Sequence, residues 1–309
     1  MNVLAATDLD QLDPGERSAL EGLLARCDQA DGHAPFPEGA LEGDGPGAPA
    51  ARRIVLGEDS GALVGSALLV AGEGLHAMTS LHVAVDPLRR DGDARSELIR
   101  SAVAEATQPV RLWIMQSSES DNHALAPLGF APERDLLQMR VPLPLTDEVV
   151  SATRPVMTRS FVPGQDDEAW LAVNNRAFAG HPEQGNWTEA TLLGRERSDW
   201  FDADGFLVAP DDTEGGLGIF ASCWTKVHRG RTPVLGEIYV ISVDPSRHGE
   251  GWGRALTVAG LQWLAAQGLT VGMLYTDASN IGAVALYGHL GFTVDHVDRS
   301  YVQAGATVN

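Results

Sequence analysis

The stretch VDPSRHGEGWGRAL, residues 243 to 256, joins the end of an apolar strand to a glycine-bearing loop and the start of a helix. A related stretch, VDPLRRDGDARSEL, occupies residues 85 to 98. Further along, APLGFAPERDLLQMRVPL (126–143) parallels YGHLGFTVDHVDRSYV (287–302) at nearly the same offset. Two landmarks repeated in the same order, at a domain-sized period, indicate a duplicated domain.

The length of 309 residues is enough for about two domains of ordinary size. Residues 141–156, with three prolines and little helical period, are interpreted as a linker. We therefore expect one domain at 1–145 and a second at 155–309.

Both halves show the same order of patterns, which is clearest in the second. There the apolar periodicity predicts two helices, then three strands, a helix, a strand, a short helix and a final strand. The predicted segments are 166–180, 186–197, 205–209, 216–227, 235–243, 251–268, 271–278, 280–291 and 291–302. Thr188 is the expected N-cap of the second helix. Each half is thus predicted to be an α/β domain with a mixed, mostly antiparallel sheet and helices on both faces.

The composition excludes several classes of partner. A net charge of −20 disfavours nucleic acid and acidic membrane surfaces. The chain has no apolar run long enough to cross a bilayer, and its first residues lack the layout of a signal peptide. Cys27 and Cys223 are too few for a disulfide framework or a thiolate zinc site. We expect a cytoplasmic monomer with no metal, nucleic acid or membrane partner.

One residue stands out in the basic set. Of 22 lysines and arginines, Lys226 is the only lysine. Heavy use of Ala, Gly and Arg fits a GC-rich coding bias, as in actinobacteria. A surviving lysine is either a chance surface residue or a position that needs a compact ammonium group.

The glycine loop predicts an anion site. Glycines let the chain turn tightly, and the free N–H groups at a helix N-terminus suit a pyrophosphate. About thirty residues later comes an Asn-x-x-Ala-x-x-x-Tyr-x-x-x-Gly-Phe pattern, from Asn280 to Phe292. With these features the second half resembles the GNAT acyl-coenzyme A N-acyltransferases, whose phosphate loop reads Arg/Gln-x-x-Gly-x-Gly/Ala. His248 departs from that pattern, while Gly251 and Gly253 match it.

The resemblance implies acetyl-coenzyme A as cosubstrate. It assigns the pantetheine arm and the thioester oxygen to the backbone of a splayed strand, and the phosphates to the loop and the short helix. The implied cofactor-binding residues are Ile241, Ser242, Val243, His248, Gly249, Glu250, Gly251, Trp252, Gly253, Arg254, Asn280, Ile281, Gly282 and Ala283.

Three stretches narrow the resemblance. NNRAFAGHPEQGNWT (174–188), WTKVH (224–228) and GEIYVISVDP (236–245) are similar to the mycothiol synthase family, the tandem-domain GNATs of actinobacteria. This resemblance implies N-acetylation of the cysteinyl amine of cysteinyl-glucosaminyl-inositol. It assigns sugar and inositol contacts to Glu38, Glu183, Lys226 and Tyr275.

Two residues are candidates for the chemistry. Glu237 lies inside the apolar strand EIYVISV, where strict alternation places it on one face with Tyr239, Ile241 and Val243. A carboxylate there costs free energy unless it is hydrogen-bonded or functional, and the resemblance implies that it is the general base. Tyr287 is the candidate general acid, since a phenol can protonate a leaving thiolate.

The first half lacks both groups. Six residues before Val85 stands Thr79, and Leu125 or Ala126 falls at the tyrosine position. This half keeps the turn, with Arg89, Gly92 and Ala94, and the strand LHVAV at 81–85. We expect it to bind acetyl-coenzyme A or to serve as a scaffold, without catalysis. Two other functions remain open for the chain: acetylation of another amine, such as an aminoglycoside or a protein N-terminus, and non-enzymatic acetyl-coenzyme A binding.

Overall fold

The structure, a computed structural model, describes residues 1–37, 40–41, 52–72, 77–90, 92–180, 185–211 and 218–303. The chain forms two compact units. The first unit comprises Met1–Leu136 and His296–Asn309, and the second comprises Leu137–Asp295. The boundary between the units therefore falls within two long strands, β7 (Phe130–Pro142) and β13 (Thr293–Gln303).

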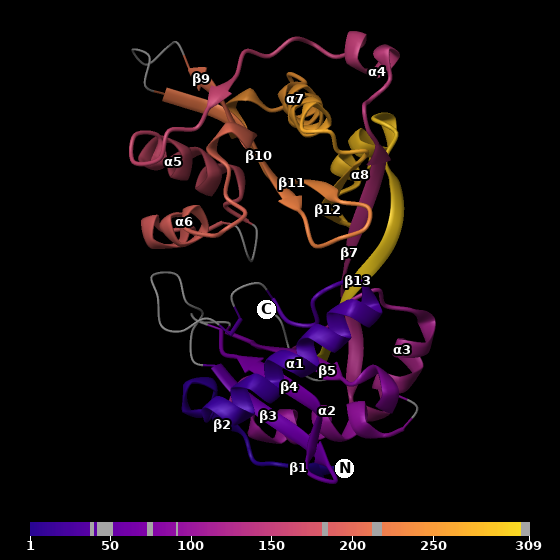
Figure 1. Ribbon diagram of the computed structural model, residues 1–309. Coiled ribbons are helices and arrows are strands. Elements are labelled where there is room, and N and C mark those ends of the chain that lie inside the picture. The colour runs from indigo at the N-terminus through magenta and orange to yellow at the C-terminus, as the bar shows by residue number, and fades with distance from the viewer. Residues whose placement is uncertain are drawn as a thin grey trace. The chain divides into compact units, whose positions relative to one another are not determined.

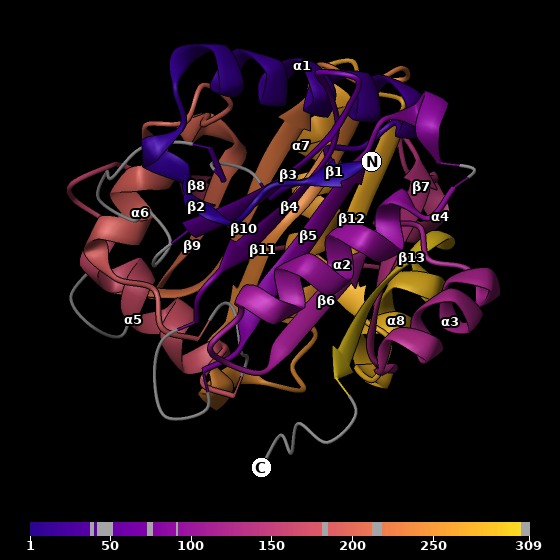
Figure 2. The ribbon, with the colours of Figure 1, turned by 90° about the horizontal axis from the view of Figure 1, so that it is seen from below.

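The first unit is a sheet with one long helix on each face (Figures 1 and 2). Its strands run in the order β1-β3-β4-β5-β6-β13-β7, with β2 beside β3. The pair β5–β6 is parallel, while β1–β3, β2–β3, β3–β4, β4–β5 and β6–β13 are antiparallel. The elements are β1 (Asn2–Val3), β2 (Thr7–Asp8), α1 (Pro14–Asp31), β3 (Arg52–Asp59), β4 (Ala62–Val70), β5 (Thr79–Val85), α2 (Ala94–Glu105), β6 (Val110–Ile114) and α3 (Glu119–Leu125). Leu20 and Leu23 of α1 pack on one face, and Leu98 and Ile99 of α2 on the other.

The second unit repeats this plan. Its strands run in the order β7-β12-β11-β10-β9-β8, and β11–β12 is parallel while β8–β9, β9–β10 and β10–β11 are antiparallel. The elements are α4 (Asp147–Ser151), β8 (Arg159–Ser160), α5 (Asp167–Ala177), α6 (Glu189–Glu196), β9 (Phe206–Asp211), β10 (Gly218–His228), β11 (Leu235–Val243), α7 (Trp252–Ala266), β12 (Val271–Asp277) and α8 (Ile281–His289). Thr188 caps α6 as expected, accepting a hydrogen bond from the Thr191 amide.

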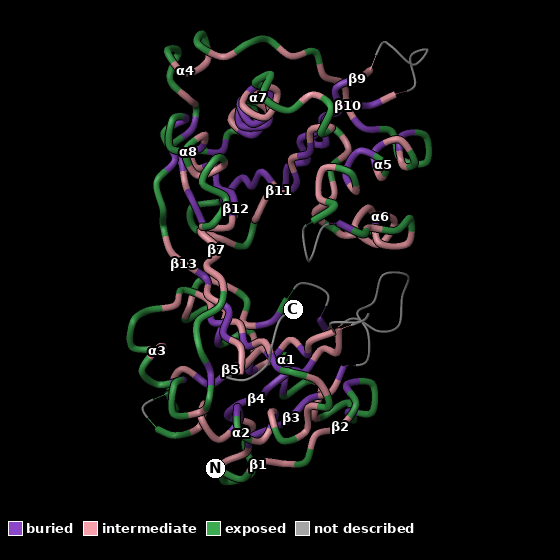
Figure 3. Tube along the Cα trace, turned by 180° about the vertical axis from the view of Figure 1, so that it is seen from behind, coloured by how far each residue is buried: buried purple, intermediate pink, exposed green. Residues whose placement is uncertain are grey.

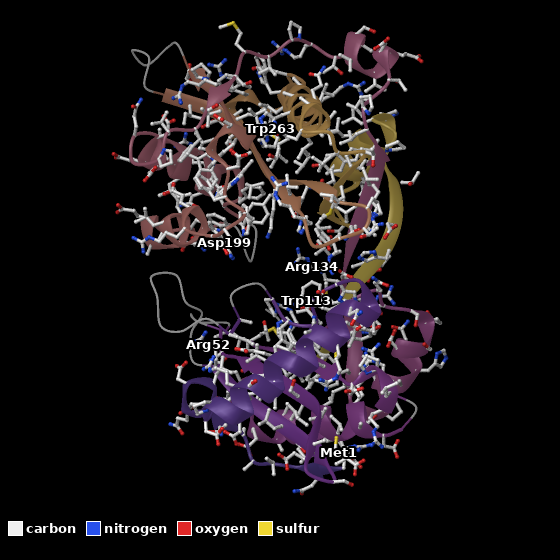
Figure 4. All side chains as sticks on the ribbon, in the orientation of Figure 1. Met1, Arg52, Trp113, Arg134, Asp199 and Trp263 are labelled. Carbon is white, nitrogen blue, oxygen red and sulfur yellow. The ribbon has the colours of Figure 1, made fainter. Side chains whose placement is uncertain are left out.

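The sheet of the second unit divides two apolar cores. On one face an aromatic cluster with α5 and α6 includes Trp170, Phe206 and Trp224. On the other face α7 and α8 pack with Cys223, Ile238 and Phe292. Figure 3 shows the buried residues gathered in the central strands and on the inner side of α7. Trp263 of α7, labelled in Figure 4, lies on this second face next to Gly205.

The two strands that cross the unit boundary explain why the domain limits differ from those expected. Val141 and Leu143, in the stretch interpreted as a linker, are buried and pack on Gly272 of β12. At the other end of the chain, residues 299–302 of β13 pair with β6. Residues 137–145 therefore belong to the second unit, and the last strand of the chain completes the sheet of the first.

The duplication is confirmed in the turn that precedes α2 in the first unit and α7 in the second. Asp86 and Asp244 have nearly the same backbone dihedrals, and each accepts a hydrogen bond from the amide two residues on. An arginine from α1 or α5 pairs with the aspartate of its unit: Arg26 with Asp86 at 2.8 Å and Arg176 with Asp244 at 2.6 Å. The Ser246 hydrogen bonds and the Arg176 guanidinium lower the pKa of Asp244 to about 2, against the effect of burial.

Candidate active site

The loop of the second unit has the geometry of an anion site. Gly249 and Gly251 both adopt the left-handed conformation, with φ of 81° and 83°. Gly251 is the N-cap of α7, and no side chain among the described residues caps that helix. The first amides of α7, at Trp252, Gly253 and Arg254, are thus left for a ligand.

Two polar side chains of this loop have hydrogen-bond partners of their own. A ring nitrogen of His248 lies 3.1 Å from the carbonyl oxygen of Val243, so the ring braces the loop against the strand end. The Glu250 carboxylate accepts a hydrogen bond from the Trp252 indole at 2.9 Å. Arg154 stacks over the same indole at 3.5 Å and donates to the Glu250 carbonyl. Arg154, which sequence reasoning did not single out, thus brings a cation to the loop.

Strands β11 and β12 separate beside this loop. Their parallel pairing covers Gly236–Gly272 and Glu237–Met273, after which both strands run on, to Val243 and Asp277. The backbone of 241–243 therefore borders a gap in the sheet, where main-chain groups of β11 lie outside that ladder. The Ser242 hydroxyl forms a buried hydrogen bond with the Ser222 hydroxyl at 2.8 Å, so this side chain already has a partner.

A β-bulge decides which face Glu237 occupies. Trp224 lies opposite Val240 and Thr225 opposite Ile238, so Tyr239 is an extra residue in β11. Glu237 and Lys226 are paired, and they share the face of Trp224, which packs on Trp170 of α5. Ile241 lies opposite Cys223, whose sulfur abuts Gly260 of α7 on the other face. The expectation that Glu237 shares a face with Ile241 and Val243 is therefore wrong, because the bulge interrupts the alternation.

Glu237 is buried, with 7% of its surface exposed. Its Oε2 lies 2.7 Å from Nε2 of His228 on β10. Lys226 is also buried, and its ammonium lies 4.3 Å from the ring centre of Trp200 and 5.4 Å from that of Tyr239. The only lysine of the chain is therefore no chance surface residue. His228 and Trp200 were not predicted from the sequence. The spacing of two residues between Lys226 and His228, which places both on one face of a strand, could have indicated His228.

Tyr287 lies on the opposite side of the sheet. It is buried in the core with α7, next to Phe292 at 5.7 Å between ring centres. Burial raises the pKa of Tyr287 to about 12, and the nearby Cys223 adds to the shift. The phenol thus stays protonated throughout the neutral range. Glu237 and Tyr287 thus lie on opposite faces of the sheet.

The remaining expected residues differ in what they offer. Asn280 caps α8 by accepting a hydrogen bond from the Ala283 amide, so its side chain has a structural task. Ile281 is 72% exposed at the start of the same helix. Tyr275 accepts a hydrogen bond from Gln138 at 2.7 Å and lies on the Glu237 side of β12. Glu38 and Glu183 lie outside the described residues.

The first unit differs at each of these points. The pairing of β4 with β5 is regular throughout, without a bulge. Because β5 has no extra residue, the residue that corresponds to Glu237 is Ser80 rather than the expected Thr79. Ser80 pairs with Arg111 of β6, as Glu237 pairs with Met273 of β12. Arg89 pairs with Asp59 at 3.1 Å, and Gly92 is not in the left-handed region.

A cavity of about 470 Å³ lies between the ends of β5 and β6 in the first unit. Val83–Val85 line one side and Trp113–Gln116 the other. Arg134 lies 5.8 Å over the Trp113 ring, and both are labelled in Figure 4. Arg90 in the cavity wall is paired with Asp31, and Arg95 with Asp121. The cations of this cavity are thus already neutralised by carboxylates.

Two features are absent from the residues that the structure describes. These residues hold no group of three or more His, Cys, Asp or Glu side chains placed for a metal ion. They also contain no helix with the length and apolar character needed to span a bilayer.

Known proteins match the chain both in one domain and over nearly its whole length. A family model described as the acetyltransferase (GNAT) family matches residues 170–292. A mycothiol acetyltransferase from Salinispora arenicola is 44% identical over 290 residues, which cover 93% of this chain and 92% of that protein. The chain belongs to the mycothiol acetyltransferase family.

Solved structures confirm the expected fold for this family member, two tandem GNAT domains. A GCN5-related N-acetyltransferase from Sphaerobacter thermophilus has a TM-score of 0.65 at 25% identity, over 97% of this chain and 95% of its own. A tandem GNAT protein from the clavulanic acid biosynthesis pathway has a TM-score of 0.69 at 15% identity, over 98% and 99%. At that identity the second likeness concerns the fold alone.

Proposed function

We propose that this mycothiol acetyltransferase family member acetylates the cysteinyl amine of cysteinyl-glucosaminyl-inositol with acetyl-coenzyme A, and that its second unit does so. The observation that carries the proposal is the place of Glu237. It is the last residue of β11 paired with β12, at the point where the two strands separate. A buried carboxylate thus borders the gap that leads to the left-handed glycine loop.

The residues present fit acetyl-coenzyme A. The uncapped amides of α7 and the left-handed Gly249 and Gly251 suit its pyrophosphate. The backbone of 241–243 suits an extended amide-containing arm and the thioester oxygen. When bound, acetyl-coenzyme A supplies the activated acetyl group.

Glu237 is the proposed general base. An α-amine has a pKa of about 8, so much of it is protonated at neutral pH and cannot attack. A carboxylate on the α5–α6 face of the gap takes that proton, directly or through a water molecule. Burial suits the task, because the carboxylate is shielded from competing solvent.

Tyr287 is the proposed general acid. Its phenol lies on the α7 side and stays protonated up to a pH near 12. Acid and base on opposite faces keep the two proton transfers apart, so the proton taken from the amine does not meet the departing sulfur. The proposed reaction needs no metal ion, since side chains and main-chain amides supply each activation.

Lys226 and Tyr275 are the proposed contacts for the sugar and inositol, together with Glu38 and Glu183. Lys226 and Tyr275 lie on the same face as Glu237. Polyols both donate and accept hydrogen bonds, so ammonium and phenol groups suit them. The rings of Trp200 and Tyr239 hold the ammonium in place.

The first unit is proposed to be catalytically silent. Ser80 and Leu125 or Ala126 stand where the second unit has its base and acid. This unit binds acetyl-coenzyme A or serves as a scaffold. We place the protein in the cytoplasm as a monomer, where Cys27 and Cys223, both buried and free, stay reduced.

The test is an acetyl-transfer assay with acetyl-coenzyme A and a panel of amines. The panel contains cysteinyl-glucosaminyl-inositol, an aminoglycoside and a peptide with a free N-terminus. The proposal predicts that the first amine has the highest kcat/KM by at least about a hundredfold, a difference of roughly 2.7 kcal/mol in transition-state binding. Turnover of another amine alone, or binding of acetyl-coenzyme A without any turnover, would contradict it.

A further inference from the structure

The side chain of Glu237 is held by a histidine on the neighbouring strand. Lys226 is directly opposite Glu237, and His228 lies two residues further along the same face of β10. The imidazole reaches diagonally across, to an Nε2–Oε2 distance of 2.7 Å. The glutamate side chain is 9% exposed and the histidine side chain 26%.

The chemistry of the two groups fixes the direction of this hydrogen bond. An ionised carboxylate only accepts, so Nε2 carries the proton and donates it. One carboxylate oxygen is thereby occupied, and Oε1 remains for the proton of an acceptor amine.

The other titratable groups near this pair come from three strands. Lys226 extends from β10 toward the rings of Trp200 and Tyr239. Tyr239 belongs to the bulge of β11, and Tyr275 lies on the same face of β12. Arg231 follows in the turn, and its amide donates to the His228 carbonyl.

The first unit supports a link between the two residues. Ser80 corresponds to Glu237, and it pairs with Val70 of β4. Val70 therefore corresponds to Lys226, the residue paired with Glu237. Two residues further on, where the second unit has His228, stands Gly72, whose carbonyl accepts from Gln108. The unit that lacks the carboxylate therefore also lacks the imidazole.

We propose that His228 is a positioning residue for Glu237. Its Nε2–H orients the carboxylate and directs one oxygen to the proton of the amine. The imidazole itself touches no reacting atom. This inference rests on the proposed function, in which Glu237 is the base.

The experiment compares three single variants of the full-length protein, with acetyl-coenzyme A and cysteinyl-glucosaminyl-inositol. His228→Phe removes the donor and keeps the bulk, His228→Gln keeps an N–H at similar reach, and Glu237→Gln removes the base. We expect His228→Phe to lower kcat about 10- to 100-fold, the range for a hydrogen bond to a charged group. The KM for acetyl-coenzyme A should not change.

Rescue by the conservative variant separates positioning from mere structure. His228→Gln should restore most of the rate, because its side-chain amide can still donate a hydrogen bond to the carboxylate. The KM for cysteinyl-glucosaminyl-inositol should also stay unchanged in His228→Phe, since the imidazole touches no substrate atom. The double variant His228→Phe with Glu237→Gln should be no slower than Glu237→Gln alone, since His228 acts through Glu237.

Each remaining outcome has one meaning. A His228→Phe enzyme with wild-type kcat, or a His228→Gln enzyme no faster than His228→Phe, overturns the positioning role. A fully active Glu237→Gln enzyme instead removes Glu237 as the base and overturns the proposed mechanism. The two failures are thereby distinguishable.

Discussion

Glu237 faces the α5–α6 side of its sheet because β11 carries one extra residue, Tyr239. That Glu237 is a functional candidate could be predicted, since burying a carboxylate in an apolar strand costs free energy unless it is hydrogen-bonded or functional. Its face could not, because strict alternation fails across a bulge and nothing in the local sequence marks one. The same bulge shifts the alignment of the halves by one residue, from Thr79 to Ser80.

Tyr287 gives a prediction about pH at the residue scale. Its pKa is raised to about 12 by burial, so the phenol remains a proton donor from pH 7 to pH 10. Wild-type kcat should therefore show no loss from tyrosine deprotonation in this range. Tyr287→Phe should lower kcat by about 100-fold or more. If the wild-type rate falls above pH 9 and Tyr287→Phe abolishes that fall, the environment assigned to Tyr287 is wrong.

Lys226 gives a prediction about substrate affinity. Lys226→Met keeps the length of the side chain against the rings of Trp200 and Tyr239 but removes the charge. We expect the KM for cysteinyl-glucosaminyl-inositol to rise about tenfold or more, the loss of one charge-assisted hydrogen bond. The KM for acetyl-coenzyme A is measured in parallel and should stay within about twofold. Equal rises for both substrates would argue against a polyol contact.

The secondary structure of the second unit was predicted closely. The expected helices at 166–180, 251–268 and 280–291 correspond to α5, α7 and α8, each shortened by a few residues at its ends. Apolar residues at helical spacing predict a helix with one buried face, and each of these helices does bury one face in the core. The stretch 141–156 was interpreted as a linker because of its three prolines. Val141 and Leu143 in this stretch instead pack on β12.

At the scale of the element, the glycine loops before α2 and α7 offer a matched pair of variants. Gly251 has a φ of 83°, a conformation that costs a residue with a side chain about 1–2 kcal/mol. The nearest atom to an added Cβ is 3.7 Å away, so Gly251→Ala brings strain without a clash. It should raise the KM for acetyl-coenzyme A about tenfold or more.

Gly92→Ala is the control for that loop. An added Cβ there meets nothing within 4 Å, and the residue is not left-handed. Turnover and the KM for acetyl-coenzyme A should match the wild type. A larger loss from Gly92→Ala than from Gly251→Ala would mean that the catalytic unit has been assigned the wrong way round.

At the scale of the whole molecule, the first unit takes a strand from a distant part of the chain. Residues 299–302 pair with β6, and Tyr301 is fully buried in the core of the first unit. The Tyr301 hydroxyl lies 2.8 Å from Asn122 and from Ser117. The repeat indicated two domains, but strand exchange leaves no local signal, since either half can supply a strand of the same pattern.

Strand exchange predicts how the chain can be divided. A fragment of residues 1–145 lacks the strand beside β6 and exposes the pocket of Tyr301, so it should show no cooperative thermal unfolding. Residues 1–136 joined through a flexible linker to 296–303 should regain a cooperative transition. Circular dichroism during heating measures both. A stable, cooperative 1–145 fragment would contradict the exchanged arrangement.

The central claim is that Glu237, at the separation of β11 and β12, is the base of an acetyl transfer carried out by the second unit. The most direct measurement is the pH–rate profile of Glu237→Gln with cysteinyl-glucosaminyl-inositol, beside Glu168→Gln, an exposed carboxylate of α5, as control. We predict a loss of about 100- to 10,000-fold at pH 7 for Glu237→Gln. Part of the rate should return as pH rises past the amine pKa of about 8. Acetyl-coenzyme A binding should be retained, and the control should be unaffected. A Glu237→Gln enzyme with near wild-type turnover at pH 7 would contradict the claim.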